Sequence, residues 1–188
     1  NTLKIQVTNS VVSGNYDVGG WIGLSDSLTT ISTVSISGEV SGSSRVGGII
    51  GQNRSNMTMA SVIYNGIADG SGNFVGGMIG ELVDGDINIS DSSNFGEIYG
   101  NEYVGGFIGG FIGENNSNVY MINSSNSGKI TGANHVGGFI GYEYSSTSVI
   151  SNSYNVGIIS ATALSAIYGA IVGDVQSTLT LTDVFHLT

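Results

Sequence analysis

Few side chains in this sequence could carry out catalysis. The two histidines, His135 and His186, lie 51 residues apart, and neither is followed by Glu. A zinc protease of the common type needs two His at i and i+4 with a Glu between them, so that site is excluded. The sequence also lacks the Gly-x-Ser-x-Gly elbow of a serine hydrolase, and its Gly-Gly-x-x-Gly stretches have no following Lys to bind phosphate. We therefore expect no catalytic residue, no cofactor and no enzymatic activity.

Acidic residues form the remaining candidates for chemistry. Asp84, Asp86 and Asp91 are the densest acidic group and could hold one Ca²⁺ through oxygen ligands. Their spacing differs from that of a calcium loop, which favours a solvated turn. Glu39 and Glu97 share a position in the repeat described below, two units apart, and such carboxylates on one sheet would suit a glycan-cleaving protein.

Composition excludes several classes of protein. The chain of 188 residues has 4 Lys and Arg against 14 Asp and Glu, a formal net charge of −10, so it cannot track the phosphates of a nucleic acid. No apolar stretch is long enough to span a membrane as a helix. Cysteine is absent, which excludes disulfides and thiolate metal sites. With 10% charged residues and abundant Gly, Ser, Thr and Asn, the composition suits a secreted, extracellular or cell-surface protein.

The elements that must position these residues come from an internal repeat. The motif Val-Gly-Gly-x-Ile-Gly begins at positions 18, 46, 75, 104 and 136, with a degenerate sixth copy at 168, so the units are 28 to 32 residues long. A Gly-x-hydrophobic-x-Gly stretch precedes most copies by eight or nine residues, and a short β-rich run precedes that stretch. Each unit therefore contains three short strands.

A unit of this size cannot bury its own apolar face, so the units must stack. We predict an all-β fold, a β-solenoid (parallel β-helix) of about six coils, forming one domain over residues 1–188. The repeat units are approximately 1–28, 29–57, 58–86, 87–118, 119–148 and 149–179, followed by a terminal strand at 180–188. Stacking places the motif Val and Ile residues in apolar files, and it aligns Asn94, Asn126 and Asn155, with a Ser two residues before each, in ladders that satisfy the backbone of turns.

These repeats resemble the GLUG motif family over essentially the whole chain, through the Gly-x-Ile-x-Gly stretch, the Val-Gly-Gly-Phe-Ile-Gly motif and the Ser-Asn-Ser-Tyr-Asn run at 151–155. The resemblance implies a tandem-repeat scaffold of large secreted or surface-attached proteins. These include adhesin-like proteins and the non-catalytic parts of immunoglobulin-A-cleaving metallopeptidases. It implies no catalytic residues.

Two sets of apolar residues are candidates for contacts with partners. If the motif forms one strand, its variable residue lies opposite the Val and Ile files, where it either packs in an internal layer or forms an exposed lateral stripe. This position holds Trp21, Ile49, Met78, Phe107, Phe139 and Ile171. The terminal strands would present unpaired edges, with Leu3, Ile5 and Val7 at one end and Leu179 and Leu181 at the other.

Asn-x-Ser/Thr acceptors for N-glycosylation occur at Asn53, Asn56, Asn88, Asn115 and Asn123, and they matter only in a eukaryotic secretory pathway.

The sequence thus favours a non-catalytic extracellular repeat module, either structural or adhesive, within a surface protein, stalk or filament. Its expected partners are further copies of itself, joined end to end or laterally, or a host or cell-surface ligand. The alternative is a glycan-binding or glycan-cleaving β-helix.

Overall fold

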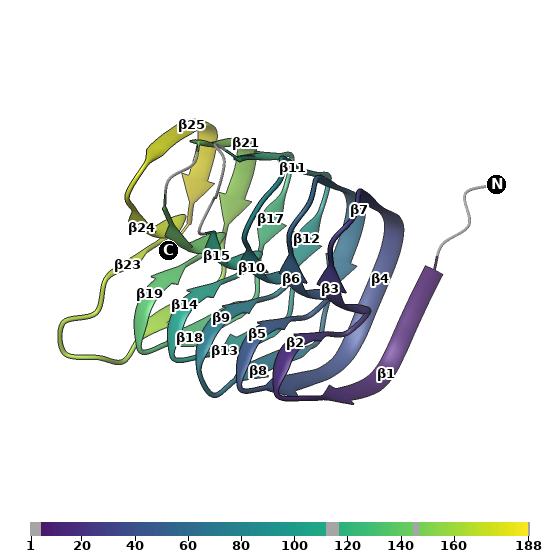
Figure 1. The fold of residues 1–188 in the computed structure, drawn as a ribbon. Helices are drawn as coiled ribbons and strands as arrows, with labels where there is room; N and C mark the ends of the chain where they lie inside the picture. Colours follow the sequence, from purple (N-terminus) through teal and green to yellow (C-terminus); the bar gives the residue numbers. More distant parts are fainter. Residues whose placement is uncertain (1–4, 112–116, 145–146, 188) are drawn as a thin grey trace.

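The protein is a rod of stacked β-coils (Figure 1). This computed structural model describes residues 5–111, 117–144 and 147–187, which contain strands and turns but no helix. Without a helix, these residues hold no helical membrane span. Every strand pair is parallel, and each coil passes through three sheets in turn. The predicted β-solenoid of about six coils with three strand positions each is confirmed.

Three sheets run the length of the rod, and we name them by their width. The wide sheet has 13 strands and the two narrow sheets have six each. The wide sheet comprises β1 (Ile5–Ser13), β4 (Thr29–Gly42), β7 (Met57–Tyr64), β8 (Ile67–Gly70), β11 (Ile87–Ser90), β12 (Ser93–Asn94), β13 (Glu97–Tyr99), β16 (Asn118–Ile122), β17 (Ser125–Asn126), β18 (Lys129–Gly132), β21 (Thr147–Asn155), β22 (Ile159–Ala161) and β25 (Thr178–His186).

The first narrow sheet comprises β2 (Tyr16–Gly19), β5 (Ser44–Gly47), β9 (Asn73–Gly76), β14 (Glu102–Gly105), β19 (Asn134–Gly137) and β23 (Tyr168–Gly169). The second comprises β3 (Ile22–Ser25), β6 (Ile50–Asn53), β10 (Ile79–Leu82), β15 (Ile108–Phe111), β20 (Ile140–Glu143) and β24 (Val172–Val175). Identical motif positions pair across neighbouring coils, as with Val75 beside Val104 and Ile79 beside Ile108. The predicted apolar files are therefore confirmed.

The Val-Gly-Gly-x-Ile-Gly motif forms a corner between two strands. In the fourth copy, β14 ends at Gly105, residues 106–107 form a bend, and β15 begins at Ile108. A Cβ on Gly105 would overlap the carbonyl oxygen of Ile108, and a Cβ on Gly109 would lie 2.5 Å from the backbone nitrogen of Val75. The glycines are required because the two narrow sheets approach each other backbone to backbone.

The expectation that this motif is one strand with its variable residue opposite the core is wrong. Two-residue alternation fails at the corner, so Val, the variable residue and Ile all contribute to the core. Ile49, Met78, Phe107 and Phe139 are 0% exposed. The rings of Phe107 and Phe139 stack with their centroids 5.1 Å apart. The variable position is thus an internal layer, and these four residues cannot form a lateral stripe.

Polar ladders continue the core on the wide sheet. Asn94 donates to Asn126 through Nδ2 to Oδ1 at 2.7 Å, and Asn126 donates to Asn155 in the same way at 2.7 Å. All three amides are 0% exposed. The Ser92 hydroxyl accepts from the backbone N–H of Val62, and Ser124 and Ser153 repeat this contact one and two coils further. The predicted Asn and Ser ladders are confirmed.

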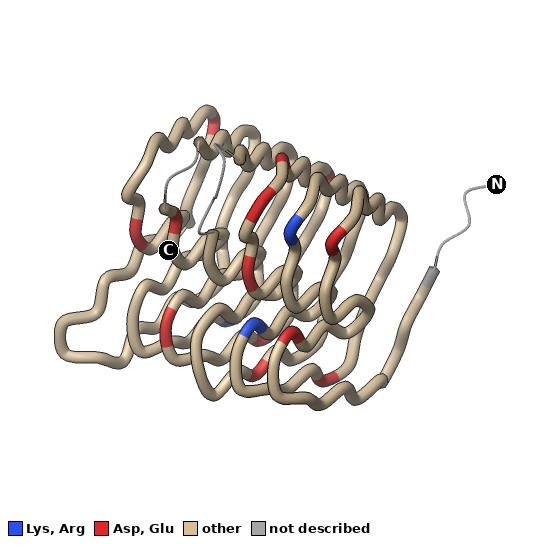
Figure 2. Tube along the Cα trace, viewed as in Figure 1, with Lys and Arg blue, Asp and Glu red and all other residues tan. Residues whose placement is uncertain are grey.

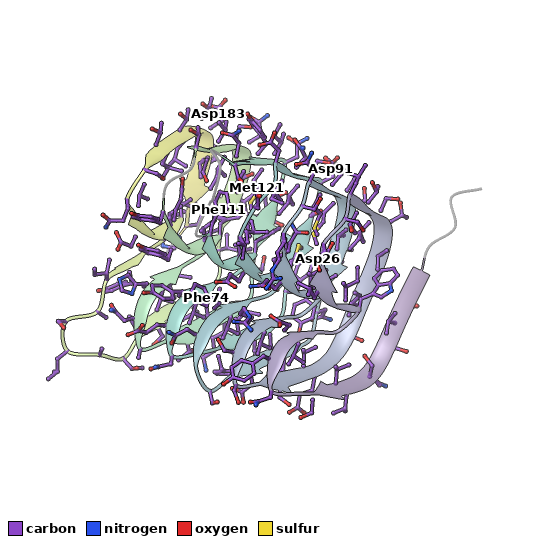
Figure 3. All side chains as sticks on the ribbon, viewed as in Figure 1. Asp26, Phe74, Asp91, Phe111, Met121 and Asp183 are labelled. Carbon is purple, nitrogen blue, oxygen red and sulfur yellow. The ribbon has the colours of Figure 1, made fainter. Side chains whose placement is uncertain are left out.

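Burial falls off at both ends of the rod. The motif strands β10 and β15 are wholly buried, whereas β24 is half-buried and most of β25 is exposed. Figure 3 shows Met121 and Phe111 inside the coils and Asp91 and Asp183 at the margin of the rod. The connection between β22 and β23 projects beyond the other coils (Figure 1), and Leu164, which belongs to this connection, is fully exposed.

Candidate binding surfaces

A row of large side chains precedes the motif Val in each coil. It contains Asp17, Arg45, Phe74, Tyr103 and His135 in parallel register. A second row, two residues after the motif Ile, contains Leu24, Gln52, Glu81, Gly110, Tyr142 and Asp174. Contacts join the two rows, as between Arg45 and Glu81 and between Tyr103 and Tyr142. We call both rows together the lateral strip.

The first row of the lateral strip has an uncommon backbone. All five of its residues are left-handed, with φ between 50° and 63°. Non-glycine residues adopt this region at a cost of about 1 kcal/mol or more each, and Phe and Tyr are less suited to it than Asn or Asp. The conformation recurs in β2, β5, β9, β14 and β19 because the parallel register imposes the same bend on these five strands of the first narrow sheet.

Aromatic rings fill the middle of the lateral strip. Phe74 stacks on Tyr103 with ring centroids 4.9 Å apart, and Tyr103 contacts His135 at 4.9 Å and Tyr142 at 4.7 Å. Gly110 leaves room for this cluster, because a Cβ there would lie 2.5 Å from the ring of Phe74. Burial raises the pKa of the Tyr103 and Tyr142 hydroxyls, so both are neutral at physiological pH. Phe74 and Tyr103 are stacked, whereas the rings of His135 and Tyr142 meet Tyr103 at angles of 36° and 41°.

Charged groups occupy the N-terminal part of the lateral strip. Arg45 makes a two-pronged hydrogen bond to Asp17, which raises the pKa of the guanidinium. Glu81 is 5% exposed, accepts a hydrogen bond from Gln52 Nε2 and lies 3.9 Å from Arg45. Burial raises the pKa of the Glu81 carboxyl, and the contacts with Gln52 and Arg45 oppose that rise. This network links the first three coils through side chains.

The C-terminal part of the lateral strip contains one of the two histidines. His135 Nε2 lies 3.4 Å from Asp174 Oδ2, an arrangement found in catalytic triads. The other ring nitrogen, His135 Nδ1, is buried and has no hydrogen-bond partner among the described residues. His186 contacts the backbone oxygen of Asn155 at 3.1 Å and extends the amide ladder. Both histidines therefore hold coils together.

Sequence reasoning missed the lateral strip. Its signal was the position before each motif Val, where a bulky or charged residue stands in every unit although its identity changes each time. The second row was hidden because Gly110 interrupts it.

A groove crosses the outer surface of the wide sheet over the first four coils. It has a volume of 510 Å³ and is lined by Asn9, Ser10, Val11, Ser37, Gly38, Glu39, Asn65, Gly66, Ile67, Phe95 and Glu97. Sequence analysis identified the shared register of Glu39 and Glu97, and the structure brings both to this groove with Ile67 between them. Both carboxylates are exposed to solvent.

The three calcium candidates do not converge. Asp84 accepts from Ser117 at 3.1 Å, Asp86 from Asn118 at 3.0 Å, and Asp91 from Asn123 at 3.1 Å, each across to the next coil. No group of three or more acidic or histidine side chains among the described residues is arranged to hold a metal ion. The carboxylates instead form separate links between neighbouring coils.

The glycosylation candidates differ in accessibility. Asn53 is 0% exposed and its amide donates to the backbone of Ser55, so it cannot carry a glycan in the folded coil, and that prediction is wrong. Asn56, Asn88 and Asn123 are exposed. Asn115 lies outside the described residues.

The two ends of the rod carry the remaining interface candidates. At the N-terminal end Trp21 is 41% exposed and Val7 is half-buried, while Leu3 lies outside the described residues and Ile5 pairs through its backbone with Val34. At the C-terminal end Leu181 is 47% exposed, and Ile171 and Leu179 are half-buried. A pocket of 330 Å³ lies beside Trp21, and another of 340 Å³ lies beside Tyr168 and His186.

Three parallel sheets wound through register-matched coils place this chain among the β-solenoid proteins. No protein-family model matches the chain, and no curated protein matches its sequence. Among solved structures, the fold is similar to a "putative immunoglobulin A1 protease" from Bacteroides ovatus, with a TM-score of 0.60 and 16% sequence identity. The match covers 96% of this chain and 57% of that one, so this chain spans little more than half of its structural neighbour. At this identity the likeness concerns the fold alone.

Proposed function

We propose that this chain is a non-catalytic structural or adhesive module of an extracellular protein, and that it assembles through the ends of its solenoid. The observation that carries the proposal is the pair of uncovered ends. Trp21 and Leu24 at one end, and Tyr168 and Leu181 at the other, are apolar side chains at 40% to 64% exposure. Corresponding residues of the middle coils are largely buried.

The register supports stacking of one copy on another, head to tail. Val7 and His186 occupy the first and last places of one inner row, which runs through Ile36 and Asn155. That row has seven places, whereas the row of motif Ile residues, from Ile22 to Val172, has six. A second copy with its Val7 one strand spacing beyond His186 would therefore continue the wide sheet, and its Ile22 would lie two spacings beyond Val172. Coils of a longer chain would fit the same surfaces in the same register.

The scarcity of charge, with abundant Gly, Ser, Thr and Asn, supports an extracellular location. The resemblance to the GLUG motif supports a scaffold role, and the likeness to a protein named as an immunoglobulin A1 protease is consistent with the non-catalytic part of such a protein.

Sedimentation velocity over a range of concentrations, with electron microscopy, tests assembly through the ends. We expect concentration-dependent head-to-tail oligomers, and we expect Leu181→Lys to abolish them because a charge cannot be buried unpaired between coils. Ile122→Lys is the matched control, since Ile122 is 41% exposed on the outer face of the wide sheet. Dispersed monomers of the unmodified chain at high concentration would refute self-assembly.

The alternative, a glycan-binding or glycan-cleaving protein, is favoured by Glu39 and Glu97 in one groove. Two strand spacings separate their backbones by about 9.6 Å, near the upper limit for carboxylates that share one glycosidic bond. Release of reducing sugar from a polysaccharide panel, lost in Glu97→Gln, would favour this alternative over a scaffold.

A further inference from the structure

The groove on the wide sheet has two dissimilar walls and a glycine floor. Gly38 and Gly66 line the floor, where the absence of side chains creates the hollow. Gly38 has a φ of 130°, which a residue with a Cβ rarely adopts, and a Cβ there would also overlap the carbonyl oxygen of Ser10. The hollow is therefore built into the fold at this point.

One wall alternates apolar and acidic side chains along the rod. Val11, Glu39, Ile67 and Glu97 follow one another in parallel register on successive coils. The opposite wall contains Asn9, Ser37, Asn65 and Phe95. Val11 is 74% exposed, Ile67 40% and Phe95 48%, so apolar side chains lie open beside the two carboxylates, with Ile67 between them. Exposed apolar side chains gathered in a groove are typical of a docking site.

Within the described residues, the two carboxylates have no basic partner. Among the described residues, no basic group forms an ion pair with Glu39 or Glu97. Lys129 is the direct register neighbour of Glu97, yet its ammonium group lies over the ring of Tyr99, 5.5 Å from the centroid. Glu97 instead accepts a hydrogen bond from the Tyr99 hydroxyl. Few basic residues occur elsewhere on the rod (Figure 2), so the groove attracts cations.

We propose that this groove binds an extended segment of a partner protein that carries two basic residues three positions apart. Two strand spacings separate Glu39 and Glu97 along the rod by about 9.6 Å. A polyproline II segment rises about 3.1 Å per residue with three residues per turn, which places residues i and i+3 on one face about 9.3 Å apart. Two basic side chains at that spacing meet both carboxylates at once.

The rest of the groove complements such a segment. The residues between the two basic positions pack on Ile67 and Phe95, and aromatic side chains suit proline rings. The amides of Asn9 and Asn65 and the hydroxyl of Ser37 lie on the opposite wall, where they can hydrogen-bond the free backbone groups of an extended chain. The groove therefore recognises charge spacing and an apolar spacer together.

Fluorescence anisotropy with a labelled Lys-Pro-Pro-Lys-Pro-Pro peptide tests the proposal with the full 188-residue chain. We expect saturable binding that weakens with salt, and at least tenfold weaker binding of an isomeric peptide with its two lysines adjacent. The Glu39→Gln/Glu97→Gln variant should bind the first peptide at least tenfold more weakly. Asp26→Asn/Asp183→Asn removes the same charge at exposed sites outside the groove and should stay within twofold of the unmodified chain.

Several results would overturn the proposal. Equal loss in both double variants would show that net charge alone attracts the peptide, and equal affinity for the two peptides would remove the spacing argument. Lack of binding at millimolar peptide would refute the site. Displacement of the peptide by neutral oligosaccharides at the same groove would assign it to glycans instead. Circular dichroism of each variant confirms that the coils are intact.

Discussion

One buried row of the wide sheet has apolar side chains in its first half and polar side chains in its second half. In the second and third coils the row contains Val34 and Val62, and from the fourth coil it continues with Ser92, Ser124 and Ser153. The neighbouring row changes in the same way, from Ile36 and Tyr64 to Asn94, Asn126 and Asn155. All ten side chains are at most 3% exposed.

The comparison shows that polar side chains can be buried as completely as apolar ones when the next coil supplies a hydrogen-bond partner at the same position. A single buried amide would leave polar groups without partners, which costs roughly 1 to 3 kcal/mol for each group. In a register-matched stack, each Asn receives its partner from the next coil at the same position. The apolar half depends on close packing, whereas the polar half depends on every coil being present.

A substitution in the middle of the Asn ladder should lower the stability most. Asn126→Leu removes the hydrogen bonds to both Asn94 and Asn155 and leaves their amides buried. We expect the free energy of unfolding to fall by about 3 kcal/mol, measured by urea denaturation. Asn88→Thr, at an exposed position of β11, should stay within about 0.5 kcal/mol. A loss below 1 kcal/mol in Asn126→Leu would show that the ladder contributes little.

A serine at position 62 would extend the polar half by one coil, and it should cost no more stability than an alanine, which only leaves a cavity. Val62→Ala should lower the free energy of unfolding by about 2 kcal/mol. Val62→Ser places a hydroxyl where the next three coils have serine, so it can donate to the Ala60 carbonyl as Ser92 donates to Ser90. We therefore expect Val62→Ser to cost no more than Val62→Ala in the same urea titration. A much larger loss for serine would show that the two halves are not interchangeable.

Glu81 in the lateral strip tests the same principle with a buried charge. Burial raises the pKa of its carboxyl, so its contribution to stability is complete below the ordinary value of about 4.3 and is lost as pH rises through the raised value. Glu81→Gln removes this loss and offers a donor to the unpartnered Gln52 Oε1. We expect the variant to be about 1 kcal/mol more stable at pH 7 and little changed at pH 4. Thermal melts across this range measure it, with the exposed Glu39→Gln as control.

Tyr64 lies at the boundary between the two halves, and removal of its hydroxyl should change the stability least. Its hydroxyl is buried without a hydrogen-bond partner among the described residues. Tyr64→Phe should therefore leave stability unchanged or raise it by up to about 1 kcal/mol, measured by urea denaturation. A loss of stability would reveal a contact of the hydroxyl that extends the Asn ladder into the apolar half.

The repeat made the fold and its ladders predictable from sequence. A fixed period sets the register, and the register then places Asn94 beside Asn126 without knowledge of the coil's shape. The corner at Gly106 and Phe107 was not predictable in this way, because two-residue alternation assumes a continuous strand and glycine interrupts it.

The surface features were less accessible to sequence reasoning. Arg45, Phe74 and His135 share a left-handed backbone, yet they have no common propensity that would mark it. The groove was found only in part, because the register of Glu39 and Glu97 is visible in the sequence while the hollow at Gly38 depends on the path of the backbone.

The amide ladder has a consequence for how such a protein can change its length. Asn94 and Asn126 are 32 residues apart in the chain and directly adjacent in space. Excision of residues 94–125 would join Ser93 to Asn126, and every remaining strand would keep a partner in the same register from the next coil. Unequal recombination between repeats could therefore shorten or lengthen the rod in whole coils, and each product would keep the same pair of end surfaces.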